Sequence, residues 1–270
     1  MAPALLSLSL LAGFVTETVD YGPDPKQKVD VVRRDPGSDD AKGLPVVVFL
    51  HGGVWQLGDR AQYRHVGLAF ASRGFVAVTA SYRLAPTHRW PAQIDDAAAI
   101  VALVKQRAAS WGGDPQRIFL VGHSAGGQLA MLLLYDDAWL AKHKLSAKDL
   151  AGVVALSGVF DLRSPLDEGQ ADGGFARFIG PVFGADVKTL RAASPIDVAK
   201  KTGTPLLFIT STEDYAAMRL QTEQMSRALS LLGERAPVVV VDGVDHMGLV
   251  SGIGRPGDQV TEEITRFLRR

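Results

Sequence analysis

The stretch "FLVGHSAGGQLAML", Phe119 to Leu132, sets one serine between glycines at the junction of two apolar segments. The residues before the first glycine are typical of a buried strand, whereas those after Ser124 are apolar at helical spacing. A strand that turns directly into a helix brings the flanking side chains into collision, so Gly122 and Gly126 must lack a Cβ there. Ser124 is therefore expected to stand exposed at the turn, where the helix directs its unpaired N–H groups and its positive dipole end.

The rest of the chain repeats this alternation of short apolar runs and longer amphipathic segments, which predicts a mostly parallel sheet flanked by helices. Buried strands are predicted at residues 46–50, 75–81, 118–122, 152–157, 206–211 and 238–242, and an antiparallel entry hairpin at 15–21 and 28–34. Helices are predicted at 63–72, 94–111, 125–135, 218–232 and 259–269. The predicted fold class is α/β, with eight strands in a single domain over residues 1–270.

One region breaks this rhythm between the predicted strands 152–157 and 206–211. Residues 161–201 are rich in glycine, proline and charge and contain no long periodic segment. A loop of that length inside a compact domain is typical of a functional lid. We expect residues 161–201 to form a small cap over the site, with short helices.

The composition excludes several function classes. Lysine plus arginine and aspartate plus glutamate each number 29, so no overall charge attracts nucleic acid or an anionic membrane. The chain has no cysteine, which removes disulfides, thiolate nucleophiles and cysteine-ligated zinc. No cofactor or metal is expected, and the oligomeric state is left open.

The apolar start of the chain, "APALLSLSLLAGF", lacks a basic leading region and a clear cleavage site and is too short to span a bilayer. It is expected to pack on the domain, and no later segment approaches the length of a membrane span. The expectation is a soluble protein, in the cytoplasm rather than the periplasm or outside the cell.

The serine in "GHSAG" is a candidate nucleophile, because G-x-S-x-G at a strand-to-helix turn exposes a serine side chain. The alternative is a glycine-rich turn that binds phosphate or has no chemical role. A serine nucleophile needs a base, and the base needs an orienting acid. Of the six histidines, His246 in "VDGVDHMGL" lies just beyond the last predicted strand, at the sheet edge where such loops gather.

The candidate acid lies in "FITSTEDYAAM", directly after the preceding strand, which offers both Glu213 and Asp214. Asp214 is preferred because it is one residue further out of the strand and precedes residues that could begin a turn. Either carboxylate could instead cap the helix that starts near Ala216.

Several motifs carry a family resemblance. The chain order Ser124, Asp214, His246 is that of an α/β-hydrolase, and "HGGVW" at 51–55 resembles the oxyanion motif of esterases and lipases of that fold. "SYRLAP" at 81–86, "WPAQIDD" at 90–96 and "GGDPQRIFLVGHSAGG" at 112–127 are similar to stretches of bacterial carboxylesterases related to the hormone-sensitive-lipase and feruloyl-esterase-like groups. The resemblance implies a serine carboxylesterase that cleaves small-molecule esters through an acyl-enzyme.

By this resemblance, the backbone N–H groups of Gly53, Val54 and Ala125 form the oxyanion hole, where donors must be preset for the developing charge. Valine at 54 replaces the commoner third glycine and is expected to limit the bulk of the ester. Trp55 is either a core aromatic residue or a wall of the substrate pocket.

Two alternatives remain. "HGGVW" also resembles the HGGxW signature of kynurenine formamidases, which use the same triad on an N-formyl group. An α/β-hydrolase fold can also serve as a non-catalytic small-molecule receptor. A nucleotide site is not expected: "GIGRPG" at 252–257 matches the dinucleotide fingerprint, but it has no strand directly before it, contains a proline, and leaves too little chain for a βαβ unit.

Overall fold

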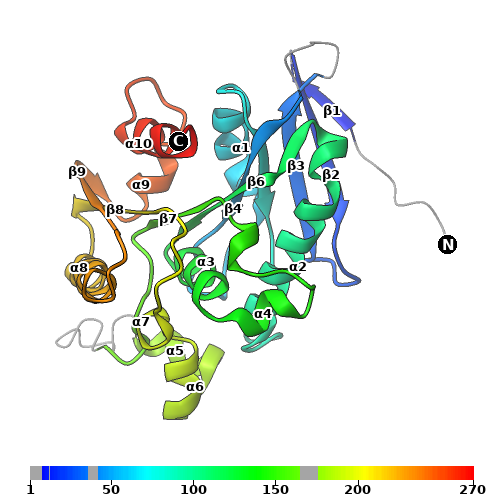
Figure 1. The fold of residues 1–270 in the computed structure, drawn as a ribbon. Coiled ribbons are helices and arrows are strands. Elements are labelled where there is room, and N and C mark those ends of the chain that lie inside the picture. Colours follow the sequence, from blue (N-terminus) through cyan, green and yellow to red (C-terminus); the bar gives the residue numbers. More distant parts are fainter. Residues whose placement is uncertain (1–7, 12, 36–41, 165–175) are drawn as a thin grey trace.

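The protein folds into a central sheet, and helices cover both of its faces (Figure 1). The computed structural model describes residues 8–11, 13–35, 42–164 and 176–270. Within these residues the sheet has nine strands, in the order β1-β2-β3-β5-β4-β6-β7-β8-β9. The strands are β1 (Leu8–Leu11), β2 (Phe14–Asp20), β3 (Lys28–Arg34), β4 (Leu44–Leu50), β5 (Val76–Ala80), β6 (Gly113–His123), β7 (Gly152–Leu156), β8 (Leu206–Glu213) and β9 (Val238–Asp245).

All eight predicted strands are present, and the predicted α/β fold class is confirmed. β2 and β3 form the predicted antiparallel hairpin, and β3 pairs antiparallel with β5. The strands β5, β4, β6, β7, β8 and β9 pair in parallel. The additional strand, β1, comes from the apolar start of the chain and pairs antiparallel with β2 at the edge of the sheet.

The helices divide between the two faces of the sheet, as Figure 1 shows. They are α1 (Arg64–Ala71), α2 (Ala92–Arg107), α3 (Ala125–Tyr135), α4 (Asp137–Ala141), α5 (Ala176–Phe183), α6 (Val187–Ala192), α7 (Pro195–Val198), α8 (Ala216–Leu231), α9 (Gly248–Ser251) and α10 (Gln259–Leu268). One core contains buried side chains of α2, α3, α4 and α8, and the other those of α1, α9 and α10. Both faces of the inner parallel strands β4 to β8 are therefore covered, which explains their apolar runs, whereas the edge strand β9 is partly exposed.

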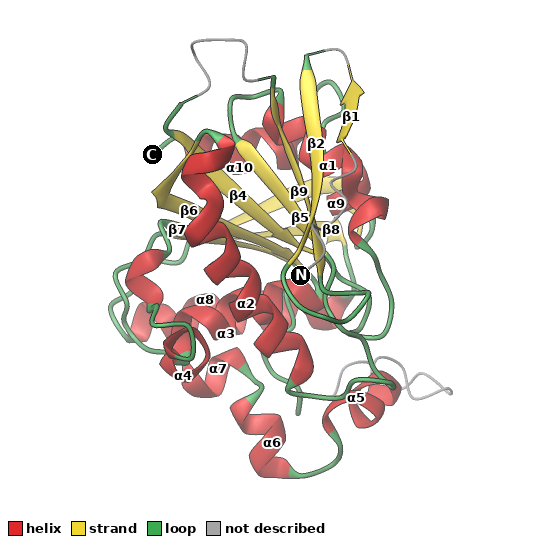
Figure 2. Ribbon diagram, turned by 90° about the vertical axis from the view of Figure 1, so that its right-hand side faces the viewer, coloured by secondary structure: helices red, strands yellow, loops and turns green. Residues whose placement is uncertain are grey.

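The predicted cap region, residues 161–201, contains the short helices α5, α6 and α7. Residues 165–175 of this prediction lie outside the described residues. Figure 2 shows α5 and α6 beyond the strands, at one end of the molecule. A role of residues 161–201 as a cap remains a prediction.

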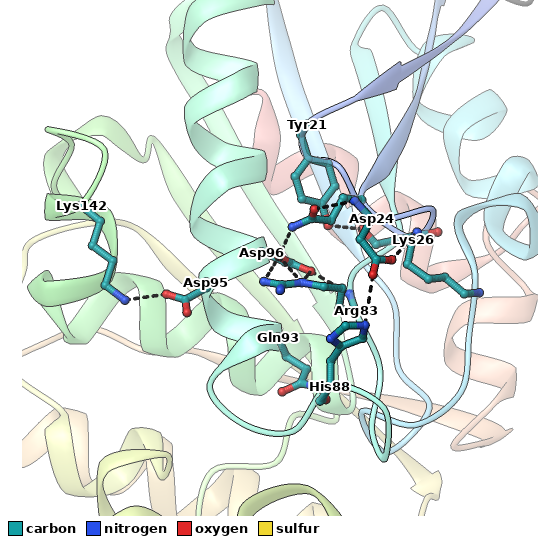
Figure 3. Close-up of polar contacts among 11 residues, drawn as sticks. Tyr21, Asp24, Lys26, Arg83, His88, Gln93, Asp95, Asp96 and Lys142 are labelled. Atoms are coloured by element: carbon teal, nitrogen blue, oxygen red, sulfur yellow. Dashed lines mark hydrogen bonds and ion pairs between the residues drawn. The ribbon is translucent and has the colours of Figure 1, made fainter. Parts of the chain in front are cut away.

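A buried carboxylate ties three distant parts of the sequence together. Asp96 on α2 is 1% exposed and accepts hydrogen bonds from the Arg83 side chain and from the Arg83 backbone N–H. It also accepts one from Gln27 Nε2 at 2.7 Å. Figure 3 shows the Arg83 and Asp96 side chains facing each other. Asp96 thus joins the β2–β3 turn and the "SYRLAP" segment to α2.

We expect Asp96→Ala to lower the free energy of unfolding by about 3 kcal/mol, because it removes one partner of a buried, hydrogen-bonded ion pair. The neighbouring Asp95 is a matched control, since it pairs with Lys142 at the surface and its side chain is 36% exposed. Asp95→Ala should cost about 1 kcal/mol or less. Urea denaturation followed by tryptophan fluorescence measures both, and equal losses would contradict a special role for Asp96.

Candidate active site

Ser124 occupies the turn between β6 and α3 in a conformation that L-residues rarely adopt, with φ 53° and ψ −118°. The flanking glycines are required there. A Cβ on Gly122 would lie 2.2 Å from the carbonyl oxygen of Gly126, and a Cβ on Gly126 would lie 2.0 Å from that of Leu50. Ser124 itself is 4% exposed, so its access is through the cavity that it lines rather than from an open surface.

The candidate acid and base are in direct contact. His246 Nδ1 lies 2.8 Å from Asp214 Oδ1, and the Asp214 side chain is fully buried. Glu213, the alternative acid, is exposed at the end of β8. The structure therefore pairs His246 with Asp214 and not with Glu213.

Both oxygens of the Asp214 carboxylate accept further hydrogen bonds. The hydroxyl of Ser157 donates to Oδ2, that of Thr210 donates to the same oxygen at 3.3 Å, and the backbone N–H of Tyr215 donates to Oδ1 at 2.8 Å. Burial alone would raise the pKa of Asp214, but its hydrogen bond and electrostatic interaction with His246, together with the hydrogen bonds from Ser157 and Tyr215, hold that pKa below its ordinary value. The carboxylate is kept ionised beside the imidazole.

Ser157 and Thr210 are site residues that the sequence reading missed. Ser157 directly follows β7 with φ 43°, and Thr210 lies within β8. Both residues lie on neighbouring parallel strands, Ser157 directly after β7 and Thr210 within β8, but no sequence pattern marks either side chain as a donor to Asp214.

The turn that carries the predicted oxyanion hole also has an unusual backbone. Gly53 has φ 115°, and a Cβ there would lie 2.3 Å from the carbonyl oxygen of Leu57. Val54 has φ 49° and lines the same cavity as Ser124. Among the contacts of the described residues, the backbone N–H groups of Gly53, Val54 and Ala125 have no acceptor. Gly53 and Val54 line the cavity, whereas Ala125 is fully buried directly after Ser124, so an oxyanion hole formed by these three N–H groups stays a prediction.

Two buried neutral histidines support these turns. His51 Nδ1–H donates to the carbonyl of Gly52 at 2.7 Å, and its ring stacks on Tyr82 with centroids 4.3 Å apart. His123 Nε2–H donates to the carbonyl of His246 at 3.0 Å. Burial lowers the pKa of His51 to about 4 and that of His123 to about 3. His123 thus anchors the loop of the candidate base without adding a positive charge to it.

These histidines predict loss of stability in acid. Their pKa values are lower in the folded protein than the ordinary 6.5, so below pH 6.5 the unfolded chain binds more protons and the free energy of unfolding falls. Each should contribute a slope of about 1.4 kcal/mol per pH unit until its folded pKa is reached. His123→Asn should show a slope shallower by that amount in urea titrations between pH 6.5 and 5. The exposed His143 provides the control, and equal slopes in His123→Asn and His143→Asn would contradict the assignment.

Ser124 and His246 line one cavity of about 610 Å³, but no hydrogen bond joins their side chains among the described contacts. Catalytic hydrogen bonds are often long before substrate binds. The described residues that line the cavity are Gly52, Gly53, Val54, Leu57, Gly58, Gln62, Tyr63, His123, Ser124, Arg177, Phe178, Tyr215, Ala217, Met218, His246 and Met247.

The structure places Trp55 in the core, so the prediction that it forms a wall of the substrate pocket is wrong. It is fully buried, and it is absent from the described lining of the cavity. Its Nε1–H donates to Gln128 Oε1 at 2.9 Å, and its ring meets Phe183 edge to face at 4.8 Å. Trp55 has a φ of 59°. Its burial and its contacts show that it is a core aromatic residue.

A hydrogen bond joins α5 to the turn that contains Gly53 and Val54. Gln56 Nε2 donates to the carbonyl of Phe178 at 3.2 Å and to that of Val54 at 3.4 Å. Arg177 and Phe178 at the start of α5 line the cavity. The start of α5 therefore borders the candidate site.

The described residues also bear on a metal site, a membrane span and the "GIGRPG" motif. The described residues contain no group of three or more histidine, aspartate or glutamate side chains placed to hold a metal, and none of their helices is long and apolar enough to cross a membrane. The "GIGRPG" segment at 252–257 follows α9 rather than a strand, so its context differs from that of a dinucleotide-binding turn.

Known proteins resemble this chain in both sequence and structure. The family model described as BD-FAE matches residues 35–229. Esterase LipC of Mycobacterium tuberculosis is 32% identical over 204 residues, covering 72% of this chain and 50% of that protein. The probable isoprenylcysteine alpha-carbonyl methylesterase ICME of Oryza sativa subsp. japonica is 28% identical over 246 residues, covering 86% and 58%.

Among solved structures, esterase B from Lactobacillus rhamnosis superposes with a TM-score of 0.81 at 20% identity, covering 96% of this chain and 88% of that one. Native esterase Est2 of Thermogutta terrifontis gives a TM-score of 0.72 at 25% identity, covering 96% and 90%. The chain spans 50% to 62% of the length of the first three curated relatives. The resemblance to esterases of the α/β-hydrolase fold is confirmed, and the family match covers more than half of the chain, so this chain belongs to the BD-FAE family.

Proposed function

We propose that the protein is a serine carboxylesterase that hydrolyses small esters through an acyl-enzyme. The observation that carries the proposal is the 2.8 Å contact between His246 Nδ1 and Asp214 Oδ1. A carboxylate can only accept, so the imidazole proton lies on Nδ1, and Nε2 is left as a base in the cavity that Ser124 lines.

In the first half-reaction, the hydroxyl oxygen of Ser124 attacks the ester carbonyl carbon while its proton passes to His246 Nε2. Asp214 stabilises the resulting imidazolium. His246 then gives this proton to the alkoxy oxygen as the bond from the carbonyl carbon to that oxygen breaks, releasing the alcohol. In the second half-reaction, water attacks the acyl group with His246 again as base, which releases the acid and restores Ser124.

The negative charge on the carbonyl oxygen would develop beside backbone N–H groups for which the described residues offer no acceptor. Gly53 and Val54 present theirs from the turn after β4, and Ala125 presents one from the first residue of α3. Backbone donors held in place before the reaction do not need to reorganise as the charge forms. The N-terminal end of the α3 dipole supports the same charge.

The names of similar proteins support this proposal. Relatives are an esterase and probable methylesterases, and the structural neighbours include Est2 with bound propionate or butyrate and esterase B inhibited by a tributyrin phosphonate. Propionate and butyrate are short acyl groups. We therefore propose short-chain carboxylic esters as the substrate class.

We expect kcat/KM on p-nitrophenyl esters to peak at acyl chains of roughly two to six carbons, because each further methylene gains only about 1 kcal/mol until the pocket is full. The Val54 side chain beside the proposed oxyanion hole and the start of α5 restrict the space. A series from acetate to palmitate measures this profile. A steady rise to long chains, with higher activity on emulsified lipid, would instead indicate that residues 161–201 form a mobile lipase lid.

The same panel tests the alternatives when N-formylkynurenine and a feruloyl ester are added. Rapid hydrolysis of N-formylkynurenine with negligible ester turnover would favour a formamidase. Binding of esters without release of alcohol would favour a receptor whose triad residues do not act in catalysis.

A further inference from the structure

Two large apolar side chains stand exposed beside the catalytic base of the proposed mechanism. Tyr215 is 56% exposed and Met247 is 52% exposed, and both line the cavity. The Tyr215 ring lies 5.2 Å from the His246 ring, and Met247 directly follows His246 in the chain. Met218, on the first turn of α8, lines the cavity with them.

The proposed reaction indicates which part of the ester lies next to Tyr215, Met218 and Met247. The proton that His246 receives from Ser124 must pass to the alkoxy oxygen, so the leaving alcohol lies within hydrogen-bond reach of His246 Nε2. Nδ1, on the other side of the ring, is occupied by Asp214. The side chains around His246 that open into the cavity are therefore placed to contact the alcohol part of the ester.

We propose that Tyr215, Met218 and Met247 form a subsite for an apolar alcohol, so that the substrates are esters of aryl alcohols or of alkyl alcohols of several carbons. This inference rests on the proposed esterase function and specifies its substrate. Tyr215 and Met247 leave apolar surface in water at the cavity, and covering this surface with an apolar ligand is favourable, whereas Met218 is 2% exposed and contributes only to the cavity wall. The two flexible thioethers adapt to alcohols of different shape.

The test uses acetate esters, so that the acyl group stays constant. Methyl, butyl and hexyl acetate lengthen an apolar alcohol, and the acetate of diethylene glycol monomethyl ether has a chain of similar length with two ether oxygens. For the wild type we expect kcat/KM to rise about tenfold from methyl to hexyl acetate, and hexyl acetate to exceed the diether ester by a similar factor.

The double variant Tyr215→Ser/Met247→Ser should reduce the methyl-to-hexyl rise to about threefold or less. Leu231→Ser is the matched control, because Leu231 is 82% exposed at the end of α8 and does not line the cavity among the described residues. The control should keep the wild-type rise. Circular dichroism and labelling of Ser124 by a phosphonate establish that the double variant is folded.

Each other outcome overturns the inference in a distinguishable way. A flat series in the wild type, or an unchanged rise in the double variant, shows that these residues do not bind the alcohol. In a parallel series from methyl acetate to methyl hexanoate, loss of the chain-length dependence in the double variant would assign them to the acyl pocket instead. If the wild type hydrolyses no ester and the phosphonate does not label Ser124, the proposed function fails and the inference fails with it.

Discussion

Ser124→Ala is expected to lower kcat/KM on p-nitrophenyl butyrate by about 10⁴-fold or more, because no other group replaces the hydroxyl as nucleophile. The free energy of unfolding should change by about 0.5 kcal/mol or less. Alanine keeps a Cβ at the strained position, and the serine hydroxyl has no hydrogen bond among the described contacts that would be lost. Initial rates and urea denaturation measure the two effects separately.

A serine-directed phosphonate provides the matching chemical test. It should attach one phosphonyl group per chain, and mass spectrometry of the digested protein should locate that group on Ser124. Ser124→Ala should remain unlabelled under the same conditions, which controls for reaction at other serines. Labelling of a different serine, or full activity in the alanine variant, would remove Ser124 from its proposed role.

The sequence predicted the sheet and the central turn because both depend on local physics. An unbroken apolar run such as that of β4 is buried on both faces, and the glycines around Ser124 have no room for a Cβ. The apolar run and the contact of Gly122 with Gly126 lie within a few consecutive residues, whereas the contact that excludes a Cβ at Gly126 is with Leu50, at the end of β4. The edge strand β1 was not predicted as a strand. Its residues form an apolar run, and nothing in the sequence indicates that this run pairs with β2.

Side-chain contacts that depend on the packing of separate strands were not predictable in this way. Ser157 donates to Asp214 across 57 residues of sequence, and a serine at the end of a strand has no pattern that marks it as a donor. Trp55 follows the glycine turn directly and could face either way. Its direction is decided by Gln128 and Phe183, which lie far along the chain.

The second large effect concerns the base. His246→Ala is expected to lower kcat/KM by about 10⁴-fold or more, since the imidazole transfers protons in both half-reactions. Asp214→Asn should cost as much or less, about 10³- to 10⁴-fold. Glu213→Gln should leave activity within about twofold, because Glu213 is exposed and Asp214 makes the contact with the imidazole.

The reason for the loss in Asp214→Asn lies in the proton positions. If the amide NH₂ faces His246, it donates to Nδ1 and forces the imidazole proton onto Nε2, where it blocks uptake of the serine proton. If the amide oxygen faces His246, the NH₂ points at the hydroxyls of Ser157 and Thr210, which can reorient to accept, and a fraction of correctly protonated imidazole survives. Values of kcat/KM for His246→Ala, Asp214→Asn and Glu213→Gln, measured from pH 5 to 9, test these roles. A severe loss in Glu213→Gln with a mild one in Asp214→Asn would transfer the acid role to Glu213, against the contact that the buried carboxylate makes with the imidazole.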